Sequence, residues 1–236
     1  MTPEQRFAEL LAAGASLPFV TYYDEASGER SELSAKSLAN WVAKTHHLLG
    51  DELGLGVGDT ALVALPAHWI SVPAILGCLT AGLHVVSEGD ADVAFVAPAT
   101  LDGTASIPDV FVIAPDSAAV GFRGAPPGDA QDYVAAVRPQ ADKWAGVQLR
   151  GTGADAGVAA RSRAEVDAVA LARAAEFGLT AGGRLLTTRD WSSSADWIDA
   201  VLAPLAVGGS VVIVRNASDD ELIERRMQQE RATARI

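Results

Sequence analysis

The sequence predicts an α/β protein in which a layered, parallel-rich sheet is flanked by helices. Short runs of β-branched or apolar residues alternate with helical patterns along the 236-residue chain, and this order is typical of strand–helix–strand units. The run at residues 110–114 is almost continuously apolar, as expected for a strand buried on both faces of a parallel sheet. A chain of this length can bury one large core or two small ones.

The first half of the chain is expected to hold most of the strands. After a strand at residues 19–23, Ser34 is the expected N-cap of a helix that runs to about Leu49 and ends at Gly50. The following elements are a strand at 61–65, a helix at about 69–80, strands near 83–86, 93–96 and 110–114, and a short helix near 131–137. The turn-rich residues 121–129 are expected to form a surface loop.

The second half alternates in the same way. A strand is expected at residues 146–149, and Ser162 and Glu165 form a capping box that opens a helix ending at Gly178. The remaining elements are a strand at 184–188, a helix at about 194–205, a strand at 210–214 and a charged helix capped by residues 218–221. We expect one domain over residues 1–236, with a modest division near 121–145 as the candidate boundary.

Charge and composition exclude several classes of function. The net charge of −12 argues against nucleic-acid binding, which requires a clustered basic face. Cys78 is the only cysteine and lies in an apolar run, so no disulfide framework is expected. The N-terminus lacks the apolar core of a signal peptide, and no run is long enough to span a membrane. We therefore expect a cytoplasmic protein that binds neither nucleic acid nor membrane.

A glycine-rich stretch with the sequence RGTGADAG, residues 150–157, lies between a predicted strand and a predicted helix. Glycines at the N-terminus of a helix allow an anion to approach the backbone N–H groups. The candidate phosphate-binding residues are Arg150, Gly151, Thr152, Gly153 and Gly157. The carboxylate of Asp155 would repel a bound triphosphate. Two interpretations stay open at this point, a phosphate site and a purely structural turn.

The histidines do not suggest a metal site. His46 and His47 are adjacent on a predicted helix, so their side chains point in different directions and cannot bind one metal ion as a pair. His68 and His84 have no nearby cysteine or carboxylate at a spacing typical of zinc ligands. No metal ligand is predicted.

Several motifs, taken in order, resemble one enzyme family. They are LSAKSLAN at residues 33–40, VGDTALVALP at 57–66, ILGCLTAG at 75–82, the glycine stretch, FGLTAGGRLL at 177–186 and LAPLAVGGSVV at 202–212. Together they resemble the N-terminal half of the AMP-binding, adenylate-forming enzymes, which include acyl-CoA synthetases, luciferases and the adenylation domains of peptide synthetases. A short actinobacterial branch of this family is similar in length and content.

The resemblance implies a nucleotide and an acyl group as ligands. By this similarity the glycine stretch is the loop that holds the phosphates of ATP or AMP. Trp191, Ser192 and Trp197 stand where the family borders its acyl pocket. Without the resemblance, the same segment is read as a helix N-cap at Ser193 or Ser194 followed by a tryptophan packed in the core. Both interpretations stay open.

The sequence also departs from the family. The glycine stretch lacks the family's lysine, and the only lysines are Lys36, Lys44 and Lys143. The family's groups for the acyl carboxylate, ribose, adenine and magnesium lie in a second half that this sequence does not contain. Without them nothing positions the carboxylate against the α-phosphate.

We therefore expect a truncated, non-catalytic binding or scaffold protein with no catalytic residues. It would form a homo-oligomer or bind a protein partner. The alternative is a protein that still binds a nucleotide or an acyl-adenylate, or a ligase that acts with a partner chain. An unrelated enzyme on the same scaffold lacks support, because the sequence shows no acid–base or nucleophile constellation.

Overall fold

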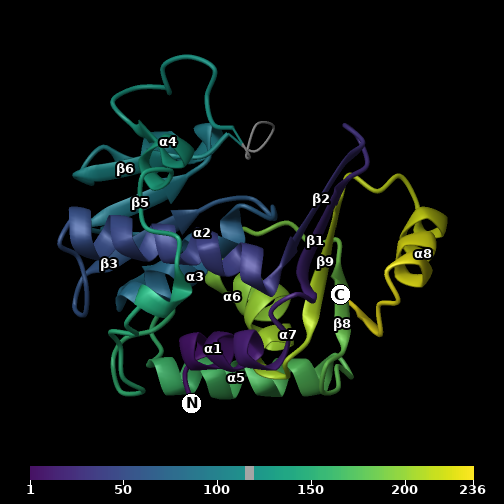
Figure 1. Cartoon of the computed structure of the whole chain (residues 1–236). Coiled ribbons are helices and arrows are strands. Elements are labelled where there is room, and N and C mark those ends of the chain that lie inside the picture. The colour runs from purple at the N-terminus through teal and green to yellow at the C-terminus, as the bar shows by residue number, and fades with distance from the viewer. Residues whose placement is uncertain (115–119) are drawn as a thin grey trace.

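The computed structural model describes residues 1–114 and 120–236. Two five-stranded sheets organise this part of the chain, and helices pack against both (Figure 1). The terminal sheet has the order β10-β8-β9-β1-β2, from β1 (Pro18–Asp24), β2 (Glu29–Ser34), β8 (Arg184–Thr187), β9 (Ser210–Arg215) and β10 (Ala234–Arg235). The central sheet has the order β4-β3-β5-β6-β7, from β3 (Thr60–Ala64), β4 (His84–Val86), β5 (Val93–Val96), β6 (Asp109–Val112) and β7 (Gln131–Asp132).

The strand pairing is parallel throughout the central sheet and between β10, β8, β9 and β1. The antiparallel pair is β1 with β2, a hairpin closed by a turn at Gly28. The predicted α/β class, with parallel-rich sheets flanked by helices, is therefore confirmed. The helices are α1 (Pro3–Gly14), α2 (Ala35–His47), α3 (Ser71–Ala81), α4 (Tyr133–Val137), α5 (Arg163–Glu176), α6 (Ser194–Trp197), α7 (Ala203–Ala206) and α8 (Asp220–Gln229).

One continuous apolar core joins the two sheets. Val20 and Ile213 of the terminal sheet belong to the same buried cluster as Val63 and Phe95 of the central sheet. Because these four side chains are all fully buried, the two sheets share their hydrophobic stabilisation. Helix α8 covers the opposite face of the terminal sheet from α5 and α7, through a smaller cluster around Ile223 (Figure 1).

Helices α2 and α3 cross closely because a glycine lies at their contact. A Cβ atom at Gly77 would lie 2.5 Å from the Cβ atom of Thr45, so no other residue fits there without movement. The Thr45 hydroxyl in turn forms a 2.7 Å hydrogen bond with the Tyr133 hydroxyl. This bond joins α2 to α4, the helix that directly follows β7 at the edge of the central sheet. None of the helices in residues 1–114 or 120–236 is long and apolar enough to cross a membrane.

Most predicted elements lie within a few residues of their observed bounds, and two predicted caps are present. The Ser34 side chain accepts a hydrogen bond from the Ser37 N–H at the start of α2. Ser162 and Glu165 form the reciprocal capping box of α5, which ends just before Gly178. Local capping chemistry therefore predicted where these two helices begin.

Two sequence predictions are wrong. The strand expected at residues 146–149 is absent. A short 3₁₀ turn at Trp144–Gly146 leads into an irregular segment whose side chains are exposed or half-buried. These residues pair with no strand of the described part of the chain. The helix that begins after Ser34, α2, does not end at Gly50. It continues as a π-helical turn over Leu48–Glu52. The helix expected at 194–205 is confirmed as a helical run over residues 194–206. It contains a π-helical turn at Ile198–Leu202 shortly before Pro204, a residue that cannot donate a helical hydrogen bond.

Some elements were not anticipated. Helix α1 begins at a capping box formed by Thr2 and Gln5, with Pro3 at the first helical position. This signal is present in the sequence and could have predicted the helix. Strands β2 and β7 carry weaker signals, because they are short or polar and are defined by the strands with which they pair.

Candidate functional site

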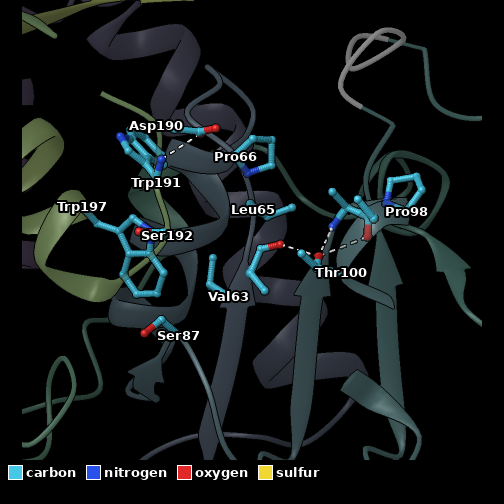
Figure 2. A pocket seen from close by; sticks show the side chains of 13 residues that line it. Val63, Leu65, Pro66, Ser87, Pro98, Thr100, Asp190, Trp191, Ser192 and Trp197 are labelled. Carbon is cyan, nitrogen blue, oxygen red and sulfur yellow. Dashed lines mark hydrogen bonds between the residues drawn. The ribbon is translucent and has the colours of Figure 1, made fainter. Parts of the chain in front are cut away.

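A cavity of about 570 Å³ lies at the carboxyl ends of β3 and β5, where these face the segment that follows β8 (Figure 2). In parallel α/β sheets, ligands bind in crevices outside the carboxyl ends of the strands. The side chains of Val63, Leu65, Pro66, Ser87, Pro98, Thr100, Asp190, Trp191, Ser192 and Trp197 line the cavity, together with Ala64, Ala97 and Ala99. Its size and its mainly apolar walls are those of a small-molecule site.

The three residues proposed from the resemblance to border an acyl pocket lie together on one wall of this cavity. Trp191 and Trp197 are buried, and Ser192 lies between them along the chain. Ser193 caps α6 through the carboxylate of Asp196, which accepts hydrogen bonds from the Ser193 N–H at 2.8 Å and hydroxyl at 3.0 Å. The cap and the cavity wall thus occur in the same segment. The indole N–H of Trp191 is shielded from solvent and has no partner among the described residues.

Asp190 contributes the formal charge in the lining of the cavity, and the sequence reasoning did not propose it for this site. Its Oδ1 accepts hydrogen bonds from the N–H groups of Trp191 at 2.8 Å and Ala67 at 3.3 Å, and from the guanidinium of Arg215. Burial raises the pKa of this carboxyl, but these three donors outweigh burial and hold the pKa below its ordinary value. Asp190 is therefore an anion at neutral pH. Its position directly after a predicted strand was the available signal.

The polar side chains of the cavity differ in whether they already form hydrogen bonds within the protein. The Thr100 hydroxyl donates to the Ala64 carbonyl at 2.7 Å and accepts from the Ala97 N–H at 3.1 Å. The Ser192 hydroxyl donates to Asp196 at 3.3 Å. Within residues 1–114 and 120–236, the Ser87 hydroxyl and Oδ2 of Asp190 have no hydrogen-bond partner. These two groups are free to bind a ligand.

The glycine stretch is closed by its own aspartate. The Asp155 carboxylate accepts hydrogen bonds from the N–H of Thr152 at 2.7 Å and from its hydroxyl at 2.9 Å. These two bonds lower the pKa of Asp155, so the loop carries a fixed negative charge. Gly157 is also engaged, because its N–H donates to the Arg161 carbonyl at 2.8 Å. No strand precedes the loop, contrary to the predicted strand–loop–helix order.

Arg150 does not direct its charge into this loop. Its guanidinium packs on Gly50 and donates to Asp51 at 3.2 Å. A different arginine, Arg163, lies beneath the loop, and its side chain would clash with any Cβ atom at Gly151. Arg163 is completely buried and forms a 2.9 Å salt bridge with Glu4. No local sequence pattern indicates this pair, because Glu4 and Arg163 are far apart along the chain.

The glycine stretch lies beside the N-terminal end and the middle of the three-residue strand β4, and the cavity lies beyond the carboxyl end of this strand. The Gly157 carbonyl accepts a hydrogen bond from the Val85 N–H, and the Arg150 N–H donates to the Thr80 carbonyl, which precedes β4. Ser87, by contrast, follows β4 and lines the cavity. None of residues 150–157 is among the lining residues. The two predicted sites are therefore not brought together.

The described residues contain no cluster of histidine, cysteine, aspartate or glutamate side chains able to hold a metal ion. Cys78 is buried, and burial raises the pKa of its thiol far above the ordinary value. A thiol in that state is a poor nucleophile. The cavity itself combines apolar walls with the polar side chains of Ser87, Thr100, Asp190 and Ser192.

Comparison with known proteins relates both the sequence and the fold to other proteins. None of the protein-family models matches the chain. A protein of Mycobacterium tuberculosis described as a TIGR03089 family protein is 36% identical over 232 residues, which cover 95% of this chain and 93% of the relative. The crystal structure of the Brucella canis acyl-CoA synthetase superposes with a TM-score of 0.78 at 17% identity. That match covers 100% of this chain and 47% of the synthetase, so the chain spans about half of the synthetase's length.

Proposed function

The chain belongs to the TIGR03089 family and has the fold of about half of an acyl-CoA synthetase, and from this we propose that it is a small-molecule-binding protein that does not adenylate acids on its own. The observation that carries the proposal is the separation of the glycine stretch from the cavity along β4. Adenylation requires the acid and the nucleotide phosphate to meet in line. A ligand in the cavity and a phosphate at the loop would be held apart.

The charge of the loop supports the same proposal. Phosphate loops bind anions through free N–H groups and cationic side chains. Here the Thr152 N–H and hydroxyl are bound to the Asp155 carboxylate, and an anion entering the loop would meet this negative charge. Two nearby arginines are committed elsewhere, Arg150 to Asp51 and Arg163 to Glu4. The exposed Arg161 lies near Glu165, where its charge helps to lower the pKa of that carboxyl. The loop thus has the backbone shape of an anion site without its electrostatics.

The proposal is tested by carboxylate-dependent exchange between ATP and labelled pyrophosphate. The full chain is assayed with a broad panel of acids, and an acyl-CoA synthetase serves as the positive control. We expect exchange no faster than in the absence of protein, because neither the phosphates nor the acid are positioned for transfer. Exchange that depends on both the acid and the protein would overturn the proposal.

A second candidate function involves a partner chain. The whole of this chain matches only 47% of the synthetase, so a protein supplying the rest could complete a nucleotide or acyl-adenylate site. The terminal sheet also has an outer strand, β10, whose free edge could pair with another chain or a second copy. Calorimetric titration with ATP, AMP and acyl-adenylate analogues tests whether nucleotide binding is retained. Absence of heat with all of them would count against this candidate.

A further inference from the structure

We propose that the cavity at the carboxyl ends of β3 and β5 selects an uncharged aromatic molecule with a hydrogen-bond-donating head group, such as a carboxamide, over the matching carboxylate. The inference deepens the proposed binding function and rests on it. It concerns the chemistry of the ligand, which is set by the charges and free polar atoms of the lining residues. This preference is the reverse of that of an acid-activating site, which must bind the carboxylate.

The walls of the cavity fit an apolar, flat body. Trp191 and Trp197 form one wall and Leu65 and Pro66 another (Figure 2). Indole side chains bury large areas and pack well against aromatic rings. The volume of about 570 Å³ lies within the range of pockets that enclose small organic ligands. An aromatic ring is therefore the body for which these walls are best suited.

The charge of the lining disfavours an anion. Asp190 is ionised, and its side chain is 59% exposed, at the edge of the cavity. No lysine, arginine or histidine is among the described residues that line the cavity. The nearest compensating cation, Arg215, is already bound to Asp190. A ligand carboxylate would thus approach one negative charge and find no free positive charge.

The free polar atoms favour a donor on the ligand. Oδ1 of Asp190 already accepts three hydrogen bonds, whereas its Oδ2 accepts none from the described residues. A ligand N–H or O–H can donate to Oδ2, and hydrogen bonds to a charged acceptor are stronger than neutral ones. The Ser87 hydroxyl lies at the other end of the cavity from Asp190 (Figure 2), so it does not bind the same head group. A carboxamide N–H can donate to Oδ2 of Asp190, and a carboxylate lacks this donor.

Matched pairs of ligands test this directly. Benzamide is compared with benzoate, and phenylacetamide with phenylacetate, by calorimetry or ligand-observed NMR with the full chain near neutral pH. We expect each amide to bind about tenfold more tightly than its acid, from the added hydrogen bond and the absence of repulsion. Equal or tighter binding of the acids would overturn the proposal, as would the absence of binding by every compound up to about 5 mM.

Asp190→Asn provides the decisive variant. The amide oxygen of asparagine can still accept the N–H bonds from Trp191 and Ala67, so the segment after β8 keeps its contacts. The change removes the negative charge and leaves the charge of Arg215 uncompensated, and we expect the preference for the amide to disappear or to reverse toward the acid. An unchanged preference in a folded Asp190→Asn protein would overturn the proposal. Asp142→Asn, the same chemical change at an exposed site outside the cavity, should bind like the wild type.

This experiment can be separated from the test of the proposed function. Acid-dependent pyrophosphate exchange would overturn the non-catalytic role whatever the ratio of amide to acid affinity. A preference for acids without exchange would overturn the ligand chemistry and leave the non-catalytic role standing. Thermal unfolding midpoints of the two variants, measured in parallel, establish that both are folded.

Discussion

The Asp155 carboxylate lies within hydrogen-bond distance of both the N–H and the hydroxyl of Thr152, at 2.7 and 2.9 Å. Aspartate often closes a turn in this way, by accepting from a nearby backbone N–H. Under the proposed function this closure matters, because it places an anion in the loop that resembles a phosphate site. The side chains of the loop stabilise a turn.

Replacement of Asp155 should loosen the loop without unfolding the protein. In Asp155→Ala the Thr152 amide loses its acceptor, and we expect its hydrogen exchange to become about tenfold faster. The overall unfolding midpoint should change little, because Asp155 is only half-buried and the bonds it loses lie within the loop. Hydrogen exchange followed by NMR measures the effect at this amide. Asp102→Ala, which removes an exposed carboxylate with no recorded hydrogen bond, is the control, and equal exchange rates in the two variants would contradict the role of Asp155.

The buried pair of Arg163 and Glu4 should be important for stability. In Arg163→Met, Glu4 is left as an unpaired buried carboxyl, and the carbonyls of Leu79 and Leu83 lose the donors that Arg163 supplies at 2.7 and 2.8 Å. Removal of one member of a buried ion pair costs about 3–5 kcal/mol. Urea unfolding measures this loss, and Arg161→Met on the exposed neighbour should change stability by less than about 0.5 kcal/mol.

A double variant tests whether the unpaired carboxylate of Glu4 causes the loss in the free energy of unfolding. Glu4→Gln combined with Arg163→Met removes the unpaired carboxyl but still leaves the two carbonyls without donors. We expect it to recover part of the lost free energy of unfolding. A double variant no more stable than Arg163→Met alone would show that the missing donors, and not the charge, dominate.

The close contact between α2 and α3 should not tolerate a methyl group. Gly77→Ala would bring a Cβ atom to 2.5 Å from the Cβ and Cγ2 atoms of Thr45, and overpacking of this kind costs about 1–3 kcal/mol. Gly103→Ala is the matched control, since its Cβ atom would have no neighbour within 4 Å. Denaturant unfolding should show a clear loss for the first variant and at most a small change for the second. Similar stabilities would contradict this close contact.

Two buried histidines should make stability depend on pH. Burial lowers the pKa of His46 and of His68 to about 4, aided by Arg150 at the first and Arg215 at the second. Because the folded pKa values lie below the ordinary value of 6.5, the unfolded chain takes up protons first. The free energy of unfolding is then at its full value above about pH 6.5 and falls as the pH is lowered toward 4. We expect a loss on the order of 2–3 kcal/mol per histidine.

Urea unfolding at several pH values between about 7 and 5 measures this dependence, in a range above the titration of ordinary carboxyl groups. His68→Gln should reduce the dependence of the unfolding free energy on pH, because glutamine does not titrate. Its amide oxygen can still accept the hydrogen bond from the Ile70 N–H that His68 Nδ1 now accepts. A free energy of unfolding that stays constant across this range would contradict neutral burial of the histidines.

The sequence predicted those parts of the molecule that depend on local chemistry. The caps at Ser34 and Ser162 and the apolar periods of most strands were sufficient to place these elements. The sequence could not predict contacts between distant segments, such as the salt bridge of Arg163 with Glu4. Nor could it show that residues 146–149 would lack a partner strand, because pairing depends on where the sheet edges lie in space.

The candidate site was predictable to a similar extent. Its aromatic wall was proposed from the segment that contains Trp191 and Trp197, and these residues do line a cavity. The role of Asp190 required the structure, since its place in the cavity lining and its ion pair with Arg215 depend on how distant segments meet. The distance of the glycine stretch from this cavity likewise follows from the path of the chain around β4 and not from any motif.

The central claim, that the glycine stretch no longer binds nucleotide phosphate, is tested most directly by an NMR titration of the ¹⁵N-labelled protein with Mg-ATP. The amide signals of Thr152 and Gly153 report on the loop. We predict that they stay unshifted up to about 5 mM Mg-ATP, because Asp155 holds the Thr152 donors and repels the anion. Saturable shifts of these two amides at lower concentrations would contradict the account.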